Sequence, residues 1–529
     1  MQKSIVVTTL FLLLFLTSWK ASFFVTELNL PTIPLDYSIN LPSYFFNNAP
    51  NSPLPTSING LDNTPANNPI TNAGATLGRV LFYDVNLSQN RTISCASCHQ
   101  QGNGFSDPNV LSNGFNGGHT RRHSMTIINA KYYQRGRFFW DERAATLEEQ
   151  VLMPFLDPVE MGLTLTSLID RVNEQYYYPT LFEEAFGTTE ITSDRISKAL
   201  AQFVRSIVSY NTKYDIGRAQ VNGPGVPFPN FTAQENQGKQ LFFATIPNGG
   251  GACFGCHTTE AFVSVNPGPQ NNGIDIISTT DLGAFETFPN IPIFQGRFKT
   301  STLRSIELTA PYMHDGRFQT LEQVVDHYNE NIQPHPTLSA ALIDQNNNPI
   351  RLNFTTTKKA AMIAFLRTLT DTSIPTAEKW SNPFINNMTL LVTNQNDTGI
   401  GSLRSIMNCA GAGDTIRFAT NVDTVFLNIP LRIFKNINLK DEIGNPVVIK
   451  ANFNISGFSN ATYGIHISNN SQVFMHNIKL SHYNNSTTKP LLKNEGNLTL
   501  SSCEVNGNIP SIVYNEGGNL TVKNVVVIK

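Results

Sequence analysis

The chain has 529 residues, of which 40% are hydrophobic and 14% charged, and its formal net charge is −2 at pH 7. A chain of this length exceeds a single hydrophobic core, so we expect about three or four domains. The near-neutral charge, without a run of lysine or arginine, argues against a nucleic-acid partner, because neutralising phosphates requires a basic surface.

The N-terminus has the pattern of a secretory signal. A charged start at Met1–Lys3 precedes a largely apolar run over Ile5–Trp19, which is typical of a signal peptide. We expect a signal over residues 1–22, with cleavage near Ala21 or Ser22, and therefore an exported protein. An uncleaved anchor is the alternative. No later stretch of sequence reaches the roughly 18 apolar residues of a membrane span.

The segment from residue 23 to 75 is rich in proline and asparagine. Proline interrupts both helical and strand periods, because it lacks a backbone N–H group and fixes its own backbone angle. We therefore expect a linker, or an arm that lies on the surface, before the first ordered domain.

Two copies of a C-x-x-C-H motif follow. They are Cys95-Ala96-Ser97-Cys98-His99 and Cys253-Phe254-Gly255-Cys256-His257. This spacing is typical of c-type haem attachment, because two thiols one turn apart can each add to a haem vinyl group while the adjoining imidazole reaches the iron. A redox dithiol or half of a zinc site is the alternative, but neither explains a histidine directly after both cysteine pairs. We expect two covalently bound haem c groups.

The two motifs lie in stretches of mainly helical sequence that share further features. Thr146-x-x-Glu149 and Thr320-x-x-Gln323 have the capping-box pattern, in which a threonine hydroxyl and the residue three positions later satisfy backbone N–H groups at a helix start. A repeated order of motifs indicates duplication. We expect two mainly α-helical, cytochrome c-like domains in tandem, over residues 76–215 and 216–380.

From residue 386 the composition shifts to asparagine, isoleucine, valine and leucine. Three segments repeat one pattern, in which two pairs of alternating apolar residues flank a two-residue corner, at intervals of about 22 to 25 residues. The pattern predicts an all-β, right-handed parallel β-helix over residues 386–529, with Cys503 as a small core residue. The aligned positions are Val473, Met475, Ile478 and Leu480; Leu498, Leu500, Cys503 and Val505; and Leu520, Val522, Val525 and Val527.

Residues 392–416 resemble the opening of pectin-lyase-like β-helix domains of exported bacterial proteins. The resemblance implies the fold and not lyase activity, because the coils carry no cluster of acids and bases. The sequence ends on Val525–Lys529 without a polar cap. Exposed strands invite pairing, so we expect this end to dock on another chain or to be covered by a loop. We expect the β-helix to serve attachment or partner contact.

Several longer motifs lie around the two haem sites. They are Leu77-Gly78-Arg79 with Leu81-Phe82-Tyr83-Asp84, Phe139-Trp140-Asp141-x-Arg143, Pro158-Val159-Glu160-Met161-Gly162 and Thr309-Ala310-Pro311-Tyr312-Met313-His314-Asp315-Gly316. With these motifs, residues 76–375 resemble the di-haem cytochrome c peroxidase and MauG superfamily. The resemblance implies an oxidoreductase that reduces hydrogen peroxide at the N-terminal haem. Electrons would pass through the C-terminal haem from a small donor protein such as a cytochrome c or a cupredoxin.

The resemblance also assigns roles to individual residues. His99 and His257 match the proximal iron ligands. Glu160 matches the distal residue that takes a proton from one peroxide oxygen and returns it to the other. Gln150 matches a polar neighbour that orients peroxide or water, and Trp140 matches the indole between the haems. The alternatives are a solvated or helix-capping acid for Glu160, a structural role for Gln150 and core packing for Trp140.

The sixth ligand of the second haem separates two branches of the superfamily. Peroxidases have a methionine at the corresponding position and MauG has a tyrosine, so Tyr328 is MauG-like. A phenolate donates negative charge and stabilises oxidised iron, whereas a thioether raises the reduction potential. The alternative is an ordinary core Tyr328, with water, Met313 or His327 at the iron.

Two features depart from the superfamily pattern. Many of its peroxidases hold a distal histidine on a mobile loop, and this chain offers His119 and His123 there, neither in clean register. His123 also replaces an asparagine that helps bind calcium between the domains, although Thr309 and Pro311 match two carbonyl ligands of that ion. One calcium ion is therefore an open expectation. His314 matches a histidine beside the second haem, where a structural role is as plausible as a catalytic one.

We therefore expect an exported di-haem peroxidase in the periplasm or at the surface of a bacterium. A second hypothesis, suggested by Tyr328, is MauG-like, peroxide-dependent oxidation of a protein side chain. A third, non-enzymatic hypothesis is a di-haem electron carrier or a surface adhesin.

Overall fold

The structure is a computed structural model, and it describes most of the chain beyond the N-terminus. The described residues are 27–50, 52, 55–133, 135–265, 268–385, 390–411, 414–441, 446–451, 463–469, 471–482, 490–506 and 512–528. The expected signal peptide over residues 1–22 lies outside these ranges. Across the described residues, no helix combines the length and the hydropathy of a membrane span.

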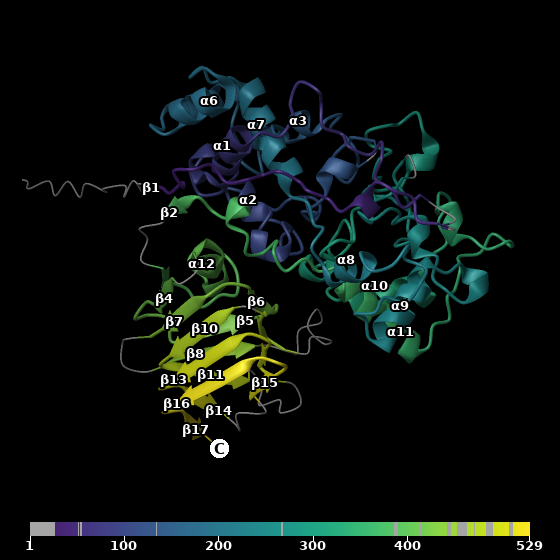
Figure 1. Cartoon of the computed structure of the whole chain (residues 1–529). Coiled ribbons are helices and arrows are strands. Elements are labelled where there is room, and N and C mark those ends of the chain that lie inside the picture. The colour runs from purple at the N-terminus through teal and green to yellow at the C-terminus, as the bar shows by residue number, and fades with distance from the viewer. Residues whose placement is uncertain are drawn as a thin grey trace, which may run out of the picture.

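The two haem motifs lie in the helical part of the molecule, at the top and right of Figure 1. The first motif belongs to a group of helices before residue 207, and the second to a group that follows it. The first group is α1 (Asn72–Tyr83), α2 (Cys95–Cys98), α3 (Leu147–Gln150), α4 (Met153–Leu156), α5 (Leu165–Asn173), α6 (Tyr178–Phe186) and α7 (Ser193–Ser206). The second is α8 (Lys213–Arg218), α9 (Ala233–Phe243), α10 (Leu321–Asp326) and α11 (Thr356–Arg367).

A shared helix crossing relates the two groups. In the first, α1 packs on α7 at Gly78, where a Cβ atom would lie 2.0 Å from the carbonyl oxygen of Ala199. In the second, α9 packs on α11 at Gly238, where a Cβ atom would lie 1.8 Å from the carbonyl oxygen of Ala361. Only glycine allows so close an approach of two backbones. This matching crossing supports a duplicated, mainly helical haem unit.

The predicted capping boxes differ in outcome. Thr320 and Gln323 form the complete reciprocal pair at the start of α10. At α3, the Thr146 hydroxyl accepts from the Glu149 N–H group at 3.1 Å, but the Glu149 carboxylate accepts from the Ala145 N–H group at 2.7 Å. The Glu149 carboxylate therefore binds the backbone N–H group of Ala145, the residue before the N-cap Thr146, and not that of Thr146 itself.

The proline-rich segment contributes to the hydrophobic core. Its strand β1 (Glu27–Leu28) pairs antiparallel with β2 (Phe384–Ile385), just after the second haem unit. Tyr37 and Phe45 are fully buried, and Phe45 packs in a cluster with Ala261, four residues after the second haem motif. The segment therefore packs against both haem units over much of its length.

The C-terminal part is a parallel β-helix, as the repeat spacing predicted. Its strands form three parallel sheets, ordered β16-β13-β10-β7-β4-β3, β17-β14-β11-β8-β5 and β15-β12-β9-β6, and one helix, α12 (Leu403–Cys409), lies at the end nearest the haem units (Figure 1). The strands are β3 (Leu391–Val392), β4 (Thr415–Phe418), β5 (Thr424–Leu427), β6 (Leu431–Ile433), β7 (Ile437–Lys440), β8 (Val447–Ala451), β9 (Ile465–Ile467), β10 (Gln472–His476), β11 (Ile478–His482), β12 (Leu492–Asn494), β13 (Asn497–Ser501), β14 (Glu504–Asn506), β15 (Val513–Asn515), β16 (Asn519–Lys523) and β17 (Val526–Ile528).

The register of the coils also agrees with the prediction. Val473 pairs with Leu498, and Leu498 with Leu520. Cys503 is fully buried in the single core that runs through the coils, and its thiol lies 3.3 Å from the Met475 carbonyl oxygen. The interpretation of Cys503 as a core residue is confirmed. Like the other five cysteines, it forms no disulfide.

The last described coil is more exposed than the others. Val522, Val526 and Val527 are 42%, 58% and 42% exposed, respectively. The docking of this end on another chain stays a prediction. At the opposite end, the Asn408 side chain of α12 donates to Gln100, directly after the first haem motif. The β-helix therefore contacts the loop that follows the first haem site.

Candidate functional site with two haem centres

The first haem motif is held by local hydrogen bonds. The Ser94 N–H group donates to Ser97 Oγ at 3.0 Å, and the His99 N–H group donates to the Cys95 carbonyl oxygen at 2.9 Å. These bonds close one helical turn, so Cys95 and Cys98 stand a turn apart. The His99 Nδ1 atom lies 3.0 Å from the Phe105 carbonyl oxygen. A hydrogen bond there leaves Nε2 as the nitrogen that can bind a metal.

The electrostatics of the thiols argue against a redox dithiol. Burial raises the pKa of Cys95 to about 12 and raises the pKa of Cys98 as well, and the nearby Glu160 charge adds to both shifts. A redox dithiol depends on a lowered thiol pKa, because the thiolate is the reactive form. The Glu160 carboxyl is therefore close enough to the two cysteines of the first motif for its charge to act on them.

Glu160 is half-buried and lies on a turn. Its N–H group donates to Asp157 Oδ1 at 3.1 Å, and its carbonyl oxygen accepts from the Phe115 N–H group at 3.1 Å. Burial raises the pKa of Glu160 to about 7; the Asp157 charge adds to that shift and Arg143 opposes it. A carboxyl that titrates near neutral pH can both take and return a proton.

Gln150 is the last residue of α3 and is half-buried. Its side-chain amide makes no hydrogen bond to another described residue, so the structure does not join it to Glu160 by direct contact. Trp140, by contrast, is firmly placed. Its indole Nε1 donates to the His123 carbonyl oxygen at 2.7 Å, and its ring centre lies 6.4 Å from that of His314.

The second motif opens onto a cavity of about 250 Å³. Cys253, Cys256 and His257 line one part of it, and most of the remaining wall is apolar. Burial lowers the pKa of His257 to about 4, although the carbonyl groups of Ser301 and Phe262 oppose this shift. A neutral imidazole in an apolar cavity, next to two thiols, suits a flat hydrophobic macrocycle with a bound metal.

Trp140 belongs to a region that adjoins both motifs. It lines the second cavity together with His123 and Met125. The Met125 carbonyl group raises the pKa of His99, against the larger lowering caused by burial, so it lies beside the first proximal histidine. The structure therefore brings Trp140, His99 and His257 into one continuous region.

Three side chains were candidates for the sixth ligand of the second haem, and the structure separates them. Tyr328 and Met313 both line the cavity of the second motif, whereas His327 does not. The His327 Nε2 atom lies 2.9 Å from the Asn272 carbonyl oxygen. This ring nitrogen is therefore engaged by a backbone carbonyl group. Burial raises the pKa of Tyr328 to about 12.

Tyr328 does not lie on a regular α-helix. The predicted helical face from Leu321 begins as α10, but at His327–Asn331 the backbone widens into a π-helical turn. Such turns are rare and occur often at functional sites, because they re-aim a side chain by one position.

The loop histidines take different places. His119 is exposed, whereas His123 is buried, with Nε2 at 3.1 Å from Ser106 Oγ and Nδ1 at 3.1 Å from the Asn109 carbonyl oxygen. Thr309 and Pro311, the two expected calcium ligands, line the second cavity. His314 stacks on Phe298, with ring centres 3.6 Å apart and planes 13° apart, and it lines the second cavity.

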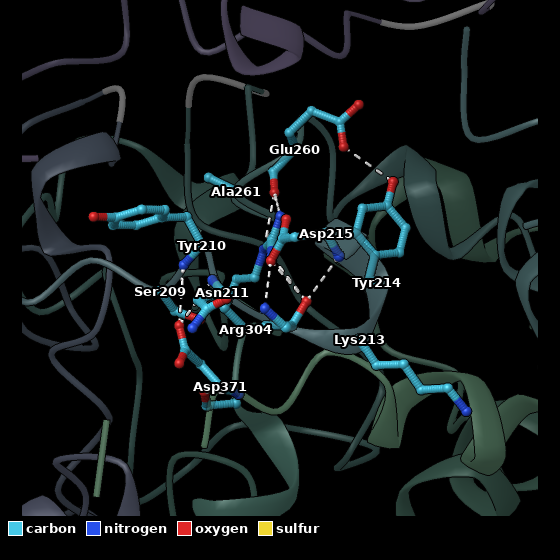
Figure 2. Close-up of polar contacts among 12 residues, drawn as sticks. Ser209, Tyr210, Asn211, Lys213, Tyr214, Asp215, Glu260, Ala261, Arg304 and Asp371 are labelled. Carbon is cyan, nitrogen blue, oxygen red and sulfur yellow. Dashed lines mark hydrogen bonds and ion pairs between the residues drawn. The ribbon is translucent and has the colours of Figure 1, made fainter. Parts of the chain in front are cut away.

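Figure 2 shows the buried polar network that holds the loop after the second motif. Arg304 is fully buried; its Nη1 donates to Asp215 Oδ2 at 2.6 Å, and its Nε donates to the Glu260 carbonyl oxygen at 2.9 Å. The Tyr214 hydroxyl donates to Glu260 Oε2 at 3.0 Å. Glu260 follows His257 by three residues, so this network fixes the segment that carries the imidazole.

The donor set fits haem at both motifs: each has paired thiols and an imidazole, with Nε2 free at His99 and an apolar wall around the second motif. Fold and site together define a c-type cytochrome with two haem centres.

The family described as di-haem cytochrome c peroxidase matches residues 72–220. The methylamine utilization protein MauG of Methylophilus methylotrophus is 30% identical over 312 residues, covering 58% of this chain and 84% of that protein. The cytochrome c551 peroxidase of Nitrosomonas europaea is 33% identical over 264 residues, covering 48% of this chain and 71% of that protein. The chain belongs to the di-haem cytochrome c peroxidase and MauG family, and is a cytochrome c peroxidase-like oxidoreductase.

A solved structure agrees with this assignment. The crystal structure of a MauG-like protein associated with microbial copper homeostasis superposes with a TM-score of 0.53 at 30% sequence identity, and covers 61% of this chain and 96% of that protein. The resemblance read from the sequence is confirmed at the level of the family and of the fold.

Sequence reasoning missed several residues of the site. The Arg122 guanidinium pairs with Asp141 at 2.5 Å and with Asp281 at 2.7 Å, and so links the two haem units beside Trp140. Lys299 donates its N–H group to the Trp140 carbonyl oxygen at 2.8 Å. The only sequence signal was that Asp141 lies inside a family motif; Arg122, Asp281 and Lys299 lie outside the motifs that the sequence offered.

Proposed function

We propose that this protein reduces hydrogen peroxide to water at the first haem centre, with electrons relayed from the second. A haem bound at His99 would supply the iron at which peroxide binds and is reduced. The observation that carries the proposal is the position of Glu160. Its carboxyl has a pKa of about 7, and its charge acts on the thiols of the first motif.

The proposed reaction assigns different roles to Glu160, Trp140 and Gln150. Glu160 can accept a proton from one peroxide oxygen and donate one to the leaving oxygen. Trp140 is proposed to carry electrons between the two centres; it lines the second cavity, and its indole donates a hydrogen bond to the His123 carbonyl oxygen. An aromatic ring fixed between two redox centres shortens the distance that an electron must cross. Gln150 is proposed to orient peroxide or water.

A stoichiometric assay of the haem-loaded protein tests this proposal. Reduction of one hydrogen peroxide to two waters consumes two electrons and two protons, so a reduced cytochrome c or cupredoxin should be oxidised at two equivalents per peroxide. We expect sustained turnover with this ratio. Consumption of peroxide without oxidation of any donor would contradict the proposed reaction.

One observation favours a second candidate function, peroxide-dependent oxidation of a protein side chain. Tyr328 lines the second cavity, and a phenolate ligand would stabilise oxidised iron. Under this function, peroxide alone should give a long-lived oxidised protein, and a partner protein should gain a covalent modification detectable by mass spectrometry. Rapid decay of the oxidised protein and an unmodified partner would exclude it.

Replacing Tyr328 with phenylalanine tests the ligand assignment. We expect Tyr328→Phe to change the electron paramagnetic resonance signal of one ferric haem, because a phenolate ligand is lost. The lifetime of the peroxide-oxidised protein should fall by about tenfold or more, since that ligand stabilises the oxidised form. His327→Gln is the matched control, because His327 lies outside the cavity. Unchanged spectra in Tyr328→Phe would assign the ligand elsewhere, with Met313 next to be tested.

We further propose export to the periplasm or the cell surface, based on the signal-like residues 1–22 and on the covalent attachment of haem c. The β-helix would then supply attachment or partner contact. A calcium ion on the carbonyl oxygens of Thr309 and Pro311 also stays a proposal, and calcium titration followed by haem absorbance would test it.

A further inference from the structure

Lys299 is buried in the wall of the second haem cavity, next to Trp140. Only 8% of its surface is exposed, and it lines the same cavity as His257 and Trp140. Its backbone N–H group donates to the Trp140 carbonyl oxygen at 2.8 Å. The preceding residue, Phe298, stacks on His314. Lys299 is therefore fixed by its backbone to the aromatic residues that separate the two sites.

The Lys299 ammonium group lies against ring faces. Its Nζ atom is 4.2 Å from the ring centre of Tyr133 and 4.8 Å from that of Phe138. The negative face of an aromatic ring attracts a cation, and more strongly so where water is excluded. The arrangement can hold a charged lysine inside an apolar wall.

The charge has no close counter-ion. Among the residues that the structure describes, no carboxylate forms an ion pair with Lys299. Glu142 acts on it only at longer range, and the Glu142 carboxylate already accepts from the Tyr133 hydroxyl and from Arg135 Nε, the latter at 2.8 Å. Burial lowers the pKa of Lys299 to about 8, so the protonated form predominates at neutral pH. Its positive charge is thus poorly neutralised.

We propose that Lys299 is a positioning residue that acts by its charge, favouring the reduced state of the second haem centre and disfavouring removal of an electron from Trp140. A buried charge is weakly screened, so it acts on neighbouring redox groups across the wall. The direction follows from sign: a nearby cation stabilises the state with one more electron. The proposal rests on the proposed function, in which the second centre stores the electron that peroxide reduction consumes.

The consequence concerns which of the two proposed reactions the chain favours. A cation beside Trp140 makes oxidation of Trp140 less favourable, so it opposes a long-lived oxidised state there. It also favours the reduced state of the second haem centre. Lys299 therefore biases the protein toward peroxidase turnover. Tyr328, if it binds the iron, acts in the opposite direction.

Reduction potentials measured without peroxide test this inference. In spectroelectrochemical titrations of the full-length, haem-loaded protein, we expect Lys299→Met to lower the ratio of reduced to oxidised second haem, at a fixed applied potential, by about tenfold. For a one-electron couple this corresponds to about 59 mV. Lys299→Arg keeps the charge and should stay within about twofold of the wild type, as judged from the same Coulomb term.

Lys213→Met is the matched control, because Lys213 also faces a ring, at 5.8 Å from Phe231, but is 43% exposed and paired with Glu235 at 2.6 Å. It should leave the potential unchanged. Circular dichroism and haem content must match between variants. An unchanged potential in Lys299→Met, or an equal shift in Lys299→Arg, overturns the inference, since the first removes the effect and the second assigns it to packing.

The outcome is separable from that of the proposed function. A potential shift in a protein that shows no peroxide turnover would support the charge effect and reject the reaction. Normal turnover with an unchanged potential in Lys299→Met would reject the role of Lys299 and leave the reaction intact.

Discussion

Peroxide turnover is expected to fall by about 10²- to 10⁴-fold in Glu160→Gln, which is the usual contribution of a positioned general acid–base group. The amide has nearly the shape of the carboxyl but cannot accept and return a proton. Haem content should not change, because the backbone bonds of Glu160 to Asp157 and Phe115 remain. Steady-state kinetics with a reduced donor measure the effect.

Glu174→Gln is the matched control for that variant. Glu174 is an acid of the same haem unit, but its side chain is 48% exposed and pairs at the surface with Arg91 at 2.6 Å. It should keep turnover within about twofold, since surface ion pairs contribute little. Equal turnover in Glu160→Gln and Glu174→Gln would remove Glu160 from the reaction and would leave the first haem site without its proposed proton carrier.

The pH profile provides a second check on the same carboxyl. The pKa of Glu160 is about 7, raised mainly by burial and further by Asp157. The carboxylate that accepts the first proton therefore predominates above pH 7, and turnover should rise as pH increases through that value. Asp157→Asn removes one cause of the shift and should move the rise to lower pH. A profile that does not differ between wild type and Glu160→Gln would contradict the assignment.

The β-helix was the part of the fold most open to prediction from sequence. Its inward positions repeat along the chain, because each coil stacks on the one before it, and a repeated contact leaves a repeated pattern. The alignment of Val473, Leu498 and Leu520 follows directly from that periodicity. The haem motifs could also be identified from the sequence, because haem attachment requires two cysteines and a histidine within five consecutive positions.

Contacts between segments that are far apart in the sequence leave no repeated pattern from which they could be predicted. Lys299 belongs to the region around Trp140 only because its N–H group meets the Trp140 carbonyl oxygen, and the ring faces around it come from Tyr133 and Phe138. The proline-rich segment was expected as a linker or arm, yet it buries Phe45. Proline content reports on the absence of regular elements, whereas burial depends on which surface the segment meets.

The β-helix also meets the haem units at a cleft that the sequence motifs did not predict. This cleft, about 130 Å³ in volume, is lined by Asn103 from the loop after the first motif, Glu307 and Tyr312 from the second haem unit, and Arg432 from β6. Tyr312 lines the second haem cavity as well. Tyr312 is therefore shared by the wall of this cleft and the wall of the second haem cavity.

Replacing Arg304 with methionine should lower the free energy of unfolding of the second haem unit by about 3 to 5 kcal/mol, the usual cost of breaking a buried ion pair from one side. Arg304 is fully buried, and its loss leaves the Asp215 carboxylate in the interior without its cation. The Glu260 carbonyl oxygen also loses a donor. Urea denaturation followed by circular dichroism measures the change.

Two further variants separate charge from geometry in this network. Arg304→Lys keeps the positive charge but loses the planar fork that reaches Asp215 and Glu260 together, so its loss of stability should lie between those of the wild type and Arg304→Met. Arg367→Met is the surface control, because Arg367 is 55% exposed and lies 3.5 Å from Glu307, and it should cost below about 1 kcal/mol. If Arg304→Met cost no more than Arg367→Met, the buried network would not be what holds the His257 loop. The second haem centre would then depend on haem attachment and core packing alone.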